Sequence, residues 1–381
     1  MRVLGTGRDG YGRALRRKAA GFMASASVAT FLIGGCSPIP ARCDGGPTPS
    51  AMSGPHAAMP QIRVGSLPFP GPFTLYDTAD PSNLGEHSYE GLILPDGDVT
   101  DRGIMYTCRG GFLDVAHIRN AIDLTAYVYA RVHRALDEGW TCVQFRAHEP
   151  SLYQVELNYP AEWWRMSSGE RALVVDELAI RLSQQLAHDV LTWHEILTWH
   201  GFKNTVIISE KGSAFSYEDL PSHGVGLLVA GCVLRMQGDF DDNVTAVLEE
   251  EIALLQPVDE KGLEEAVAAV EGLWWDGAEP LKRNLDVGEA DGIIEPWLVA
   301  DLSCCASATH PPAAFEIPSL NDVHGRSFEG FSIVTIEPRV LEADDIRSRL
   351  PHDDNLIVPE RDFPILLADI AAEVGHENTA P

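Results

Sequence analysis

The sequence predicts a mostly α-helical domain, or an α+β domain with a small sheet, behind an N-terminal signal peptide and a proline-rich tether. Long stretches place apolar residues three or four positions apart and are flanked by helix-capping residues, whereas strand-like runs are few and short. A chain of 381 residues, with 45% hydrophobic and 22% charged residues, can also bury a sizeable core.

Five segments carry the helical pattern. Apolar residues recur at helical spacing along residues 112–136. Ser167 and Glu170 form a capping box, which predicts a helix from there to His200, where Gly201 ends it. The other three predicted helices are 218–236, 244–255 and 263–273.

Four short runs of β-branched and aromatic residues predict strands. They are 142–146, 153–157, 205–208 and 331–336. So few strands can form only a small sheet beside the helices.

Residues 1–35 have the order of a secretory signal: a basic stretch that ends at Lys18, an apolar stretch, and small residues just before Cys36. This ending resembles the site at which bacterial lipoproteins are lipid-modified and cleaved. We therefore expect a lipoprotein signal peptide over 1–35 and a mature chain that begins at Cys36 in the cell envelope. An uncleaved anchor and an ordinary signal peptide are the alternatives. Ser37, in place of an aspartate, favours the outer membrane, with the domain facing the periplasm.

The rest of the chain divides by composition. Residues 36–72 are rich in proline and glycine and show no periodicity, which predicts an extended tether. A single globular domain is expected over 73–371, followed by a polar tail over 372–381.

The net charge of −28 limits the partners. Because residues 1–35 hold six basic residues and one acid, the remainder carries −33. Such a charge repels nucleic acid and anionic lipid headgroups, so no nucleic-acid partner is expected and membrane contact is assigned to the lipid anchor. Protein partners are not indicated.

Six cysteines follow Cys36, which permits up to three disulfides in an oxidising compartment. Cys108 has an alternative role. It precedes the helix predicted from residue 112 and stands beside Arg109, and both features would lower a thiol pKa and suit a nucleophile. A disulfide is the favoured prediction.

Ionisable residues interrupt apolar helix faces at two places. The helix that ends at His200 is apolar nearly all round in its last turns, yet it contains His188, His194 and Glu195. Buried ionisable groups need partners, and where they cluster they are candidates for function. A structural role for these side chains is the alternative.

The helix at 112–136 shows the same feature, because His117 stands among apolar neighbours with Asp114 three residues before it. Between a predicted strand and the third helix, Ser216 and Asp219 are explained by helix capping, but Glu210 and Glu218 are not. We expect His117 to approach His194 and Glu195 at a cleft lined by Glu210 or Glu218, as an acid/base pair or as ligands of one metal ion.

Familiar catalytic signatures are missing. His194 and Glu195 begin as a zinc-protease motif does, but Thr198 stands where the second histidine is required. There is no GxSxG motif, no phosphate-binding loop and no GxGxxG after a strand, so α/β-hydrolase and nucleotide-binding classes are unsupported.

Several motifs resemble an uncharacterised family of bacterial lipoproteins, the domain of unknown function 4056. They read YTCRGGFLD from Tyr106, WHEI from Trp193, SAFS from Ser213 with Glu218 and Asp219 after it, WWD from Trp274 and PWL from Pro296. The resemblance spans roughly residues 100–300 and implies an envelope lipoprotein without an established activity. The family pattern continues EDLYSNLLG, whereas this chain has EDLPSHGVG over 218–226.

Together these features predict a lipid-anchored envelope protein that hydrolyses an envelope component, with metal assistance, through His117, His194, Glu195 and Glu218. Glu195 would be the general base and the histidines would be metal ligands or proton carriers. The rival prediction is a non-catalytic binding or scaffold lipoprotein. The metal, any other cofactor and the substrate are left open.

The anchor can be tested directly. Cys36→Ser removes the thiol that would carry the lipid, so the variant should lose labelled palmitate and leave the membrane fraction. The parent chain is the control. Palmitate that remains on the variant would contradict lipid modification at Cys36.

Overall fold

The computed structural model describes residues 54–66, 76–89, 102–202, 211–277, 279–308 and 310–377. All of them belong to one compact unit, Gly45–Pro381. The predicted signal peptide, Cys36, the strand at 205–208 and Glu210 lie outside the described residues. Within the described ranges the fold is α+β, with seven α-helices and small antiparallel sheets, as the sequence predicts.

In chain order, the elements are β1 (Ile104–Thr107), β2 (Gly111–Asp114), α2 (Val115–Glu138), β3 (Cys142–Arg146), β4 (Ser151–Leu157), the 3-10 helix η2 (Trp163–Arg165), α3 (Ser168–Trp199), α4 (Asp219–Val233), α5 (Phe240–Leu254), α6 (Glu260–Val270), β5 (Trp275–Asp276), β6 (Glu279–Pro280), β7 (Ile293–Ile294), the 3-10 helix η3 (Ser303–Cys305), β8 (Phe315–Glu316), β9 (Ser332–Pro338), α7 (Ala343–Ser348) and α8 (Pro359–Glu377).

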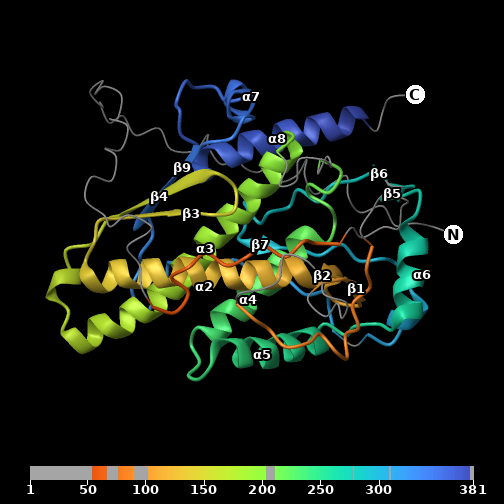
Figure 1. The fold of residues 1–381 in the computed structure, drawn as a ribbon, viewed down its shortest axis with the longest axis horizontal. Helices are drawn as coiled ribbons and strands as arrows, with labels where there is room; N and C mark the ends of the chain where they lie inside the picture. Colours follow the sequence, from red (N-terminus) through yellow and green to blue (C-terminus); the bar gives the residue numbers. More distant parts are fainter. Residues whose placement is uncertain are drawn as a thin grey trace, which may run out of the picture. The chain divides into compact units, whose positions relative to one another are not determined.

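Three helices form the centre of the core. The α2 helix packs against both α3 and α4, and α5 packs against α4 (Figure 1). Two glycines let α4 approach closely: a Cβ at Gly226 would lie 2.5 Å from the carbonyl oxygen of Ile118 on α2, and one at Gly231 would lie 2.4 Å from the Gln184 side chain on α3. The glycine-rich sequence of α4 is therefore explained by packing.

The main sheet has three antiparallel strands in the order β3–β4–β9. Along β4, buried and half-buried residues alternate, which is the pattern of a strand with one face on the core. Tyr153 on β4 pairs with Phe145 on β3 and Ile336 on β9, and all three are fully buried. This sheet contains three of the four predicted strands.

The start of the first predicted helix is wrong. Residues 111–114 form β2, which pairs with β1 in a hairpin, and α2 begins only at Val115. Gly111 has φ 70° at the turn, and the Thr107 hydroxyl accepts a 2.9 Å hydrogen bond from the Gly110 amide. Because of this tight turn, residues 111–114 form a strand and not the first turn of a helix. Cys108 therefore lies in the hairpin turn and not at a helix N-terminus.

The other helix boundaries follow local chemistry. Ser167 caps α3 by accepting a hydrogen bond from the Glu170 amide, as predicted. One of the two bonds of the predicted capping box of α4 is present, because the Asp219 carboxylate accepts a 2.7 Å hydrogen bond from the Ser216 amide. The helix itself begins at Asp219, and the side chain of Glu218, at the cap position, makes no capping hydrogen bond.

Part of the predicted tether lies on the domain. The Asn120 side-chain amide on α2 exchanges two 2.8 Å hydrogen bonds with the backbone of Arg63, and Arg63 Nη1 lies 2.5 Å from the buried Asp123 carboxylate. Residues 54–66 are therefore part of the packed structure, because specific hydrogen bonds outweigh the extended tendency of this proline-rich stretch. At the other end, α8 continues past residue 371 to Glu377.

Cys108 forms a disulfide with Cys305, which excludes the alternative of a nucleophilic thiol at Cys108. Cys142 is disulfide-bonded too. Cys232 and Cys304 are free. Among the described residues, no helix has the length and apolar character needed to cross a membrane.

The Cys108–Cys305 disulfide closes a loop with a sequence separation of 197 residues. Replacing both cysteines with serine should lower the free energy of unfolding by about 2–5 kcal/mol, because the unfolded chain regains that freedom. The melting temperature should fall by about 3–7 °C. Cys232→Ser, at an exposed free thiol, is the control and should melt like the parent. An unchanged melt of the double variant would contradict a structural role for the disulfide.

Candidate metal centre

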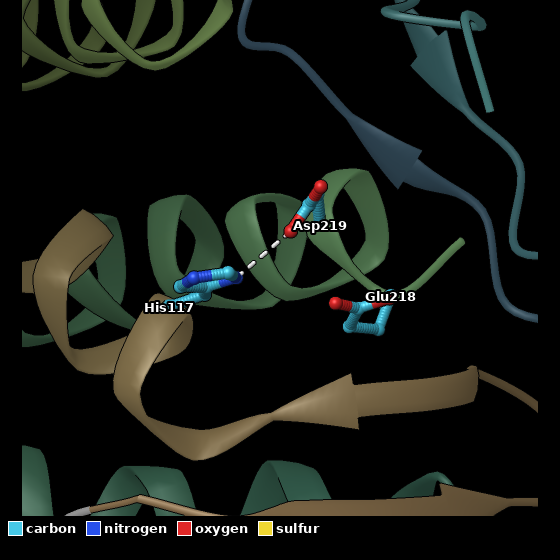
Figure 2. A group of neighbouring side chains, drawn as sticks. All are labelled: His117, Glu218 and Asp219. Atoms are coloured by element: carbon cyan, nitrogen blue, oxygen red, sulfur yellow. Dashed lines mark ion pairs between the residues drawn. The ribbon is translucent and has the colours of Figure 1, made fainter. Parts of the chain in front are cut away.

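Three side chains from two helix starts converge in the core. Their potential ligand atoms, one from each of His117, Glu218 and Asp219, all lie within 4.8 Å of one another. Figure 2 shows His117 in the first turn of α2 facing Glu218 and Asp219 at the start of α4. We call these three residues the ligand group.

Hydrogen bonds between the two helix starts hold this arrangement. Asp114 caps α2 with a carboxylate oxygen that accepts from the Ala116 amide at 2.8 Å. The Asp114 amide donates to the Ser222 hydroxyl at 2.8 Å, and that hydroxyl donates to the Glu218 carbonyl oxygen at 2.6 Å. The partial positive charge at the start of α4 also favours acidic side chains there.

The carboxylates of the ligand group are almost inaccessible to solvent, with Glu218 and Asp219 each 1% exposed. One Glu218 oxygen accepts from the Ser216 hydroxyl at 2.7 Å, but its Oε2 is buried without a hydrogen-bond partner among the described residues. His117 Nδ1 lies 3.0 Å from Asp219 Oδ1 and forms an ion pair with it. A buried polar atom left without a partner is costly, so Glu218 Oε2 needs another partner.

The spacing suits a metal ion. Two ligand atoms that each lie about 2.1 Å from one ion are about 3.0–3.4 Å apart at octahedral or tetrahedral angles. The separation of 3.0 Å between His117 Nδ1 and Asp219 Oδ1 matches this range. One imidazole nitrogen and two carboxylates are ligands that zinc, manganese and iron accept.

The segment 54–66 lies against one edge of the His117 ring. A Cβ at Gly65 would lie 2.3 Å from His117 Nε2 and 2.9 Å from Asp114 Oδ2, so the backbone at Gly65 approaches this edge closely. The Ser66 amide donates a 2.5 Å hydrogen bond to Asp114 Oδ2. The other nitrogen, His117 Nδ1, faces Asp219.

Four carboxyl groups interact electrostatically with His117: those of Asp114, Glu195, Glu218 and Asp219. Burial tends to lower the pKa of His117, but Asp114, Asp219 and Glu218 outweigh it and raise the pKa to about 10. Burial, followed by the charge of Asp219, raises the pKa of Glu218 well above its ordinary value. A bound cation would lower the free-energy cost of burying so many carboxyl groups around one imidazole.

Glu195 approaches from α3. Its Oε2 accepts a 2.8 Å hydrogen bond from the amide of Phe215, which adopts a left-handed backbone with φ 56°. That conformation is strained for a residue other than glycine, and it turns the Phe215 amide toward Glu195. Burial and the charge of Asp219 raise the pKa of Glu195 to about 8, a value suited to proton transfer near neutral pH.

His194 faces a different partner. Its Nδ1 lies 2.6 Å from Oε1 of Glu149, in the loop between β3 and β4. Burial opposes protonation, but the Glu149 carboxylate outweighs it and raises the pKa of His194 to about 9. His194 and His117 keep 22% and 23% of their side chains exposed, so solvent reaches this region past the histidines.

Two further histidines are buried and neutral. Burial lowers the pKa of His188 to about 4, and it lowers the pKa of His223 well below its ordinary value, helped by the charges of neighbouring histidines. The His223 ring centre lies 5.8 Å from that of His117.

The structure brings together two of the four predicted site residues, His117 and Glu218. Glu195 interacts electrostatically with His117, and His194 pairs with Glu149, but neither Glu195 nor His194 belongs to the ligand group. The sequence predicts that His117 meets His194 and Glu195 at one ion. Among the described residues, the group of potential ligands that contains His117 includes neither of them.

Sequence reasoning missed Asp219, Glu149 and His223. Asp219 had a sufficient explanation as a capping residue, and one of its oxygens does bond to Ser216, while the other faces His117. Its position beside Glu218 was the available signal. Glu149 lies in a loop, where no periodicity marks a buried side chain.

The fold and the site define an α+β domain with a buried histidine–carboxylate group at the junction of two helix starts. The profile of the family described as "Protein of unknown function (DUF4056)" matches residues 55–287, and the chain belongs to this family. The match includes the ligand group and most of the segment 54–66. No curated protein and no solved structure matches the chain.

Two buried glutamates should respond oppositely to the same substitution. Because the pKa of Glu195 is raised from 4.5 to about 8 in the fold, charging it opposes folding as pH rises through this window. Glu195→Gln should therefore stabilise the chelator-treated protein, by at most about 3 kcal/mol at pH 7, with no gain below pH 4.5.

Glu149→Gln is the matched control. The His194 partner lowers the pKa of Glu149 despite burial, so the carboxylate stabilises the fold above its ordinary pKa. Losing it should cost about 3–5 kcal/mol. Denaturant unfolding of both variants at pH 4 and pH 7 measures the effects. Destabilisation by Glu195→Gln at pH 7 would show that Glu195 is an ordinary structural group.

Proposed function

We propose that this protein is a lipid-anchored envelope hydrolase in which His117, Glu218 and Asp219 hold a divalent metal ion and Glu195 acts as the general base. The observation that carries the proposal is the ligand group itself. Its atoms lie within 4.8 Å of one another and include a buried oxygen, Glu218 Oε2, that lacks a hydrogen-bond partner among the described residues.

A structural ion pair is the competing explanation for the ligand group. A protonated His117 would neutralise one carboxylate, but Asp114, Glu195, Glu218 and Asp219 all interact with it. The raised pKa values of Glu195 and Glu218 mean that these two acids are held in the neutral form without an ion, which costs stability that a divalent ion would restore. A divalent ion balances more of the charge and satisfies Glu218 Oε2 as well.

The chemistry follows from the same geometry. A metal ion bound here would polarise the scissile bond and make water more acidic. Glu195, with its pKa of about 8, would accept a proton from that water, and the Phe215 amide fixes one of its oxygens. His194, held by Glu149, would carry protons between Glu195 and solvent.

The anchoring and the compartment come from the sequence. A lipid on Cys36 would hold the chain at the membrane, facing the periplasm, and the proposed substrate is a component of the envelope within its reach. The disulfide between Cys108 and Cys305 is consistent with an oxidising compartment.

Metal binding tests the proposal first. Chelator-treated full-length protein titrated with Zn²⁺ or Mn²⁺ should bind one ion and gain about 2.7 kcal/mol of stability at a free-ion concentration 100 times the Kd. Asp219→Asn should lose most of this gain, because a neutral amide is a poor ligand for these ions.

Asp362→Asn is the matched control. Asp362 also bonds to a backbone amide, Val358, at 2.8 Å and lies 2.9 Å from a histidine, His352, but on α8. It should keep the full metal effect. If the parent neither binds these ions nor gains stability, the metal centre is wrong.

Activity separates the hydrolase from a binding protein. Isolated envelopes incubated with the metal-loaded protein should release soluble fragments, and Glu195→Gln should abolish release while retaining the ion. A protein that binds the ion but releases nothing beyond the Glu195→Gln background would be a non-catalytic envelope protein.

A further inference from the structure

His223 lies on the same face of α4 as Asp219. The two residues are four positions apart, and side chains at that spacing in a helix are neighbours. Pairs of ligands at this spacing are a common way for one helix to bind one metal ion. The ligand group therefore extends along α4 toward His223.

The His223 side chain has no other evident task. It is 3% exposed, and its ring forms no hydrogen bond within the part of the chain that the structure describes. A histidine whose ring nitrogens make no hydrogen bond keeps them available to a metal ion.

The ring positions are compatible with a shared ion. Imidazoles that bind one ion through nitrogens at about 2.1 Å have ring centres about 4.6–5.3 Å apart at octahedral or tetrahedral angles. The ring centres of His117 and His223 are 5.8 Å apart, with the planes inclined by 45°. His223 lies outside the group whose ligand atoms are within 4.8 Å of one another, so its side chain would have to rotate toward the ion on metal binding.

We propose that His223 is a second nitrogen ligand of this ion, beside His117 Nδ1, Glu218 and Asp219. The inference rests on the proposed metal centre and goes beyond it, because two imidazoles and two carboxylates favour zinc over manganese, which prefers oxygen ligands. His223 would then determine which metal the site selects.

The test measures the dissociation constants of Zn²⁺ and Mn²⁺ for the chelator-treated full-length chain and for His223→Asn. Loss of a nitrogen ligand should weaken Zn²⁺ binding about tenfold or more, with a smaller change for Mn²⁺. A merely structural effect would weaken both ions alike, so the ratio of the two constants identifies the role.

His188→Asn is the matched control, because it removes a buried, neutral histidine that lies outside the ligand group. It should leave the ratio unchanged. An unchanged ratio in His223→Asn, with tight zinc binding by the parent, would overturn the role of His223 and leave the metal centre standing. No binding by the parent would overturn both.

A measurement on the parent protein avoids any loss of folding in the variant. With Co²⁺ in the site, each ligated histidine contributes one exchangeable ring N–H resonance that the paramagnetic ion shifts far outside the ordinary proton range. Two such resonances are expected, from His117 and His223. A single one would contradict ligation by His223.

Discussion

The placement of several acids around one imidazole inside the core constrains much of this structure. Buried carboxylates are tolerated only with hydrogen bonds, cations or a raised pKa, and all three occur here. Backbone amides at 215 and 216 bond to Glu195 and Asp219, His117 supplies positive charge, and burial raises the pKa of Glu195 and Glu218. The strained backbone of Phe215 is one consequence, because that amide must point at α3.

The packing of α4 serves the same constraint. Its first turn must lie against the start of α2 for Glu218 and Asp219 to face His117, and its later glycines allow the helix to follow α2 and α3 at very short range. A helix with larger residues at Gly226 would be pushed away from the Ile118 carbonyl oxygen, and the whole helix start would move with it. The glycines distant from the ligand group therefore help to hold its geometry.

Regular features of the fold could be predicted from the sequence, and features made by long-range contacts could not. The α3 helix and its Ser167 cap follow from periodicity and from one local hydrogen bond. The β1–β2 hairpin was missed because a tight turn at Gly111 overrides an apolar pattern that continues into α2. In the site, His117 and Glu195 could be identified because charged residues on apolar helix faces are conspicuous. Asp219 was hidden by its capping role, and Glu149 meets His194 only through tertiary structure.

The segment 54–66 decides how His117 can act. It covers Nε2 through Gly65 and is fixed by Asn120, Asp123 and Asp114, which all belong to α2 or its cap. Because the family match begins at residue 55, this covering segment lies almost wholly within the family's domain. A free histidine could offer either nitrogen to a ligand. Here the backbone of Gly65 lies against Nε2 and Nδ1 faces Asp219, so the orientation of the imidazole is set before any ion or substrate arrives.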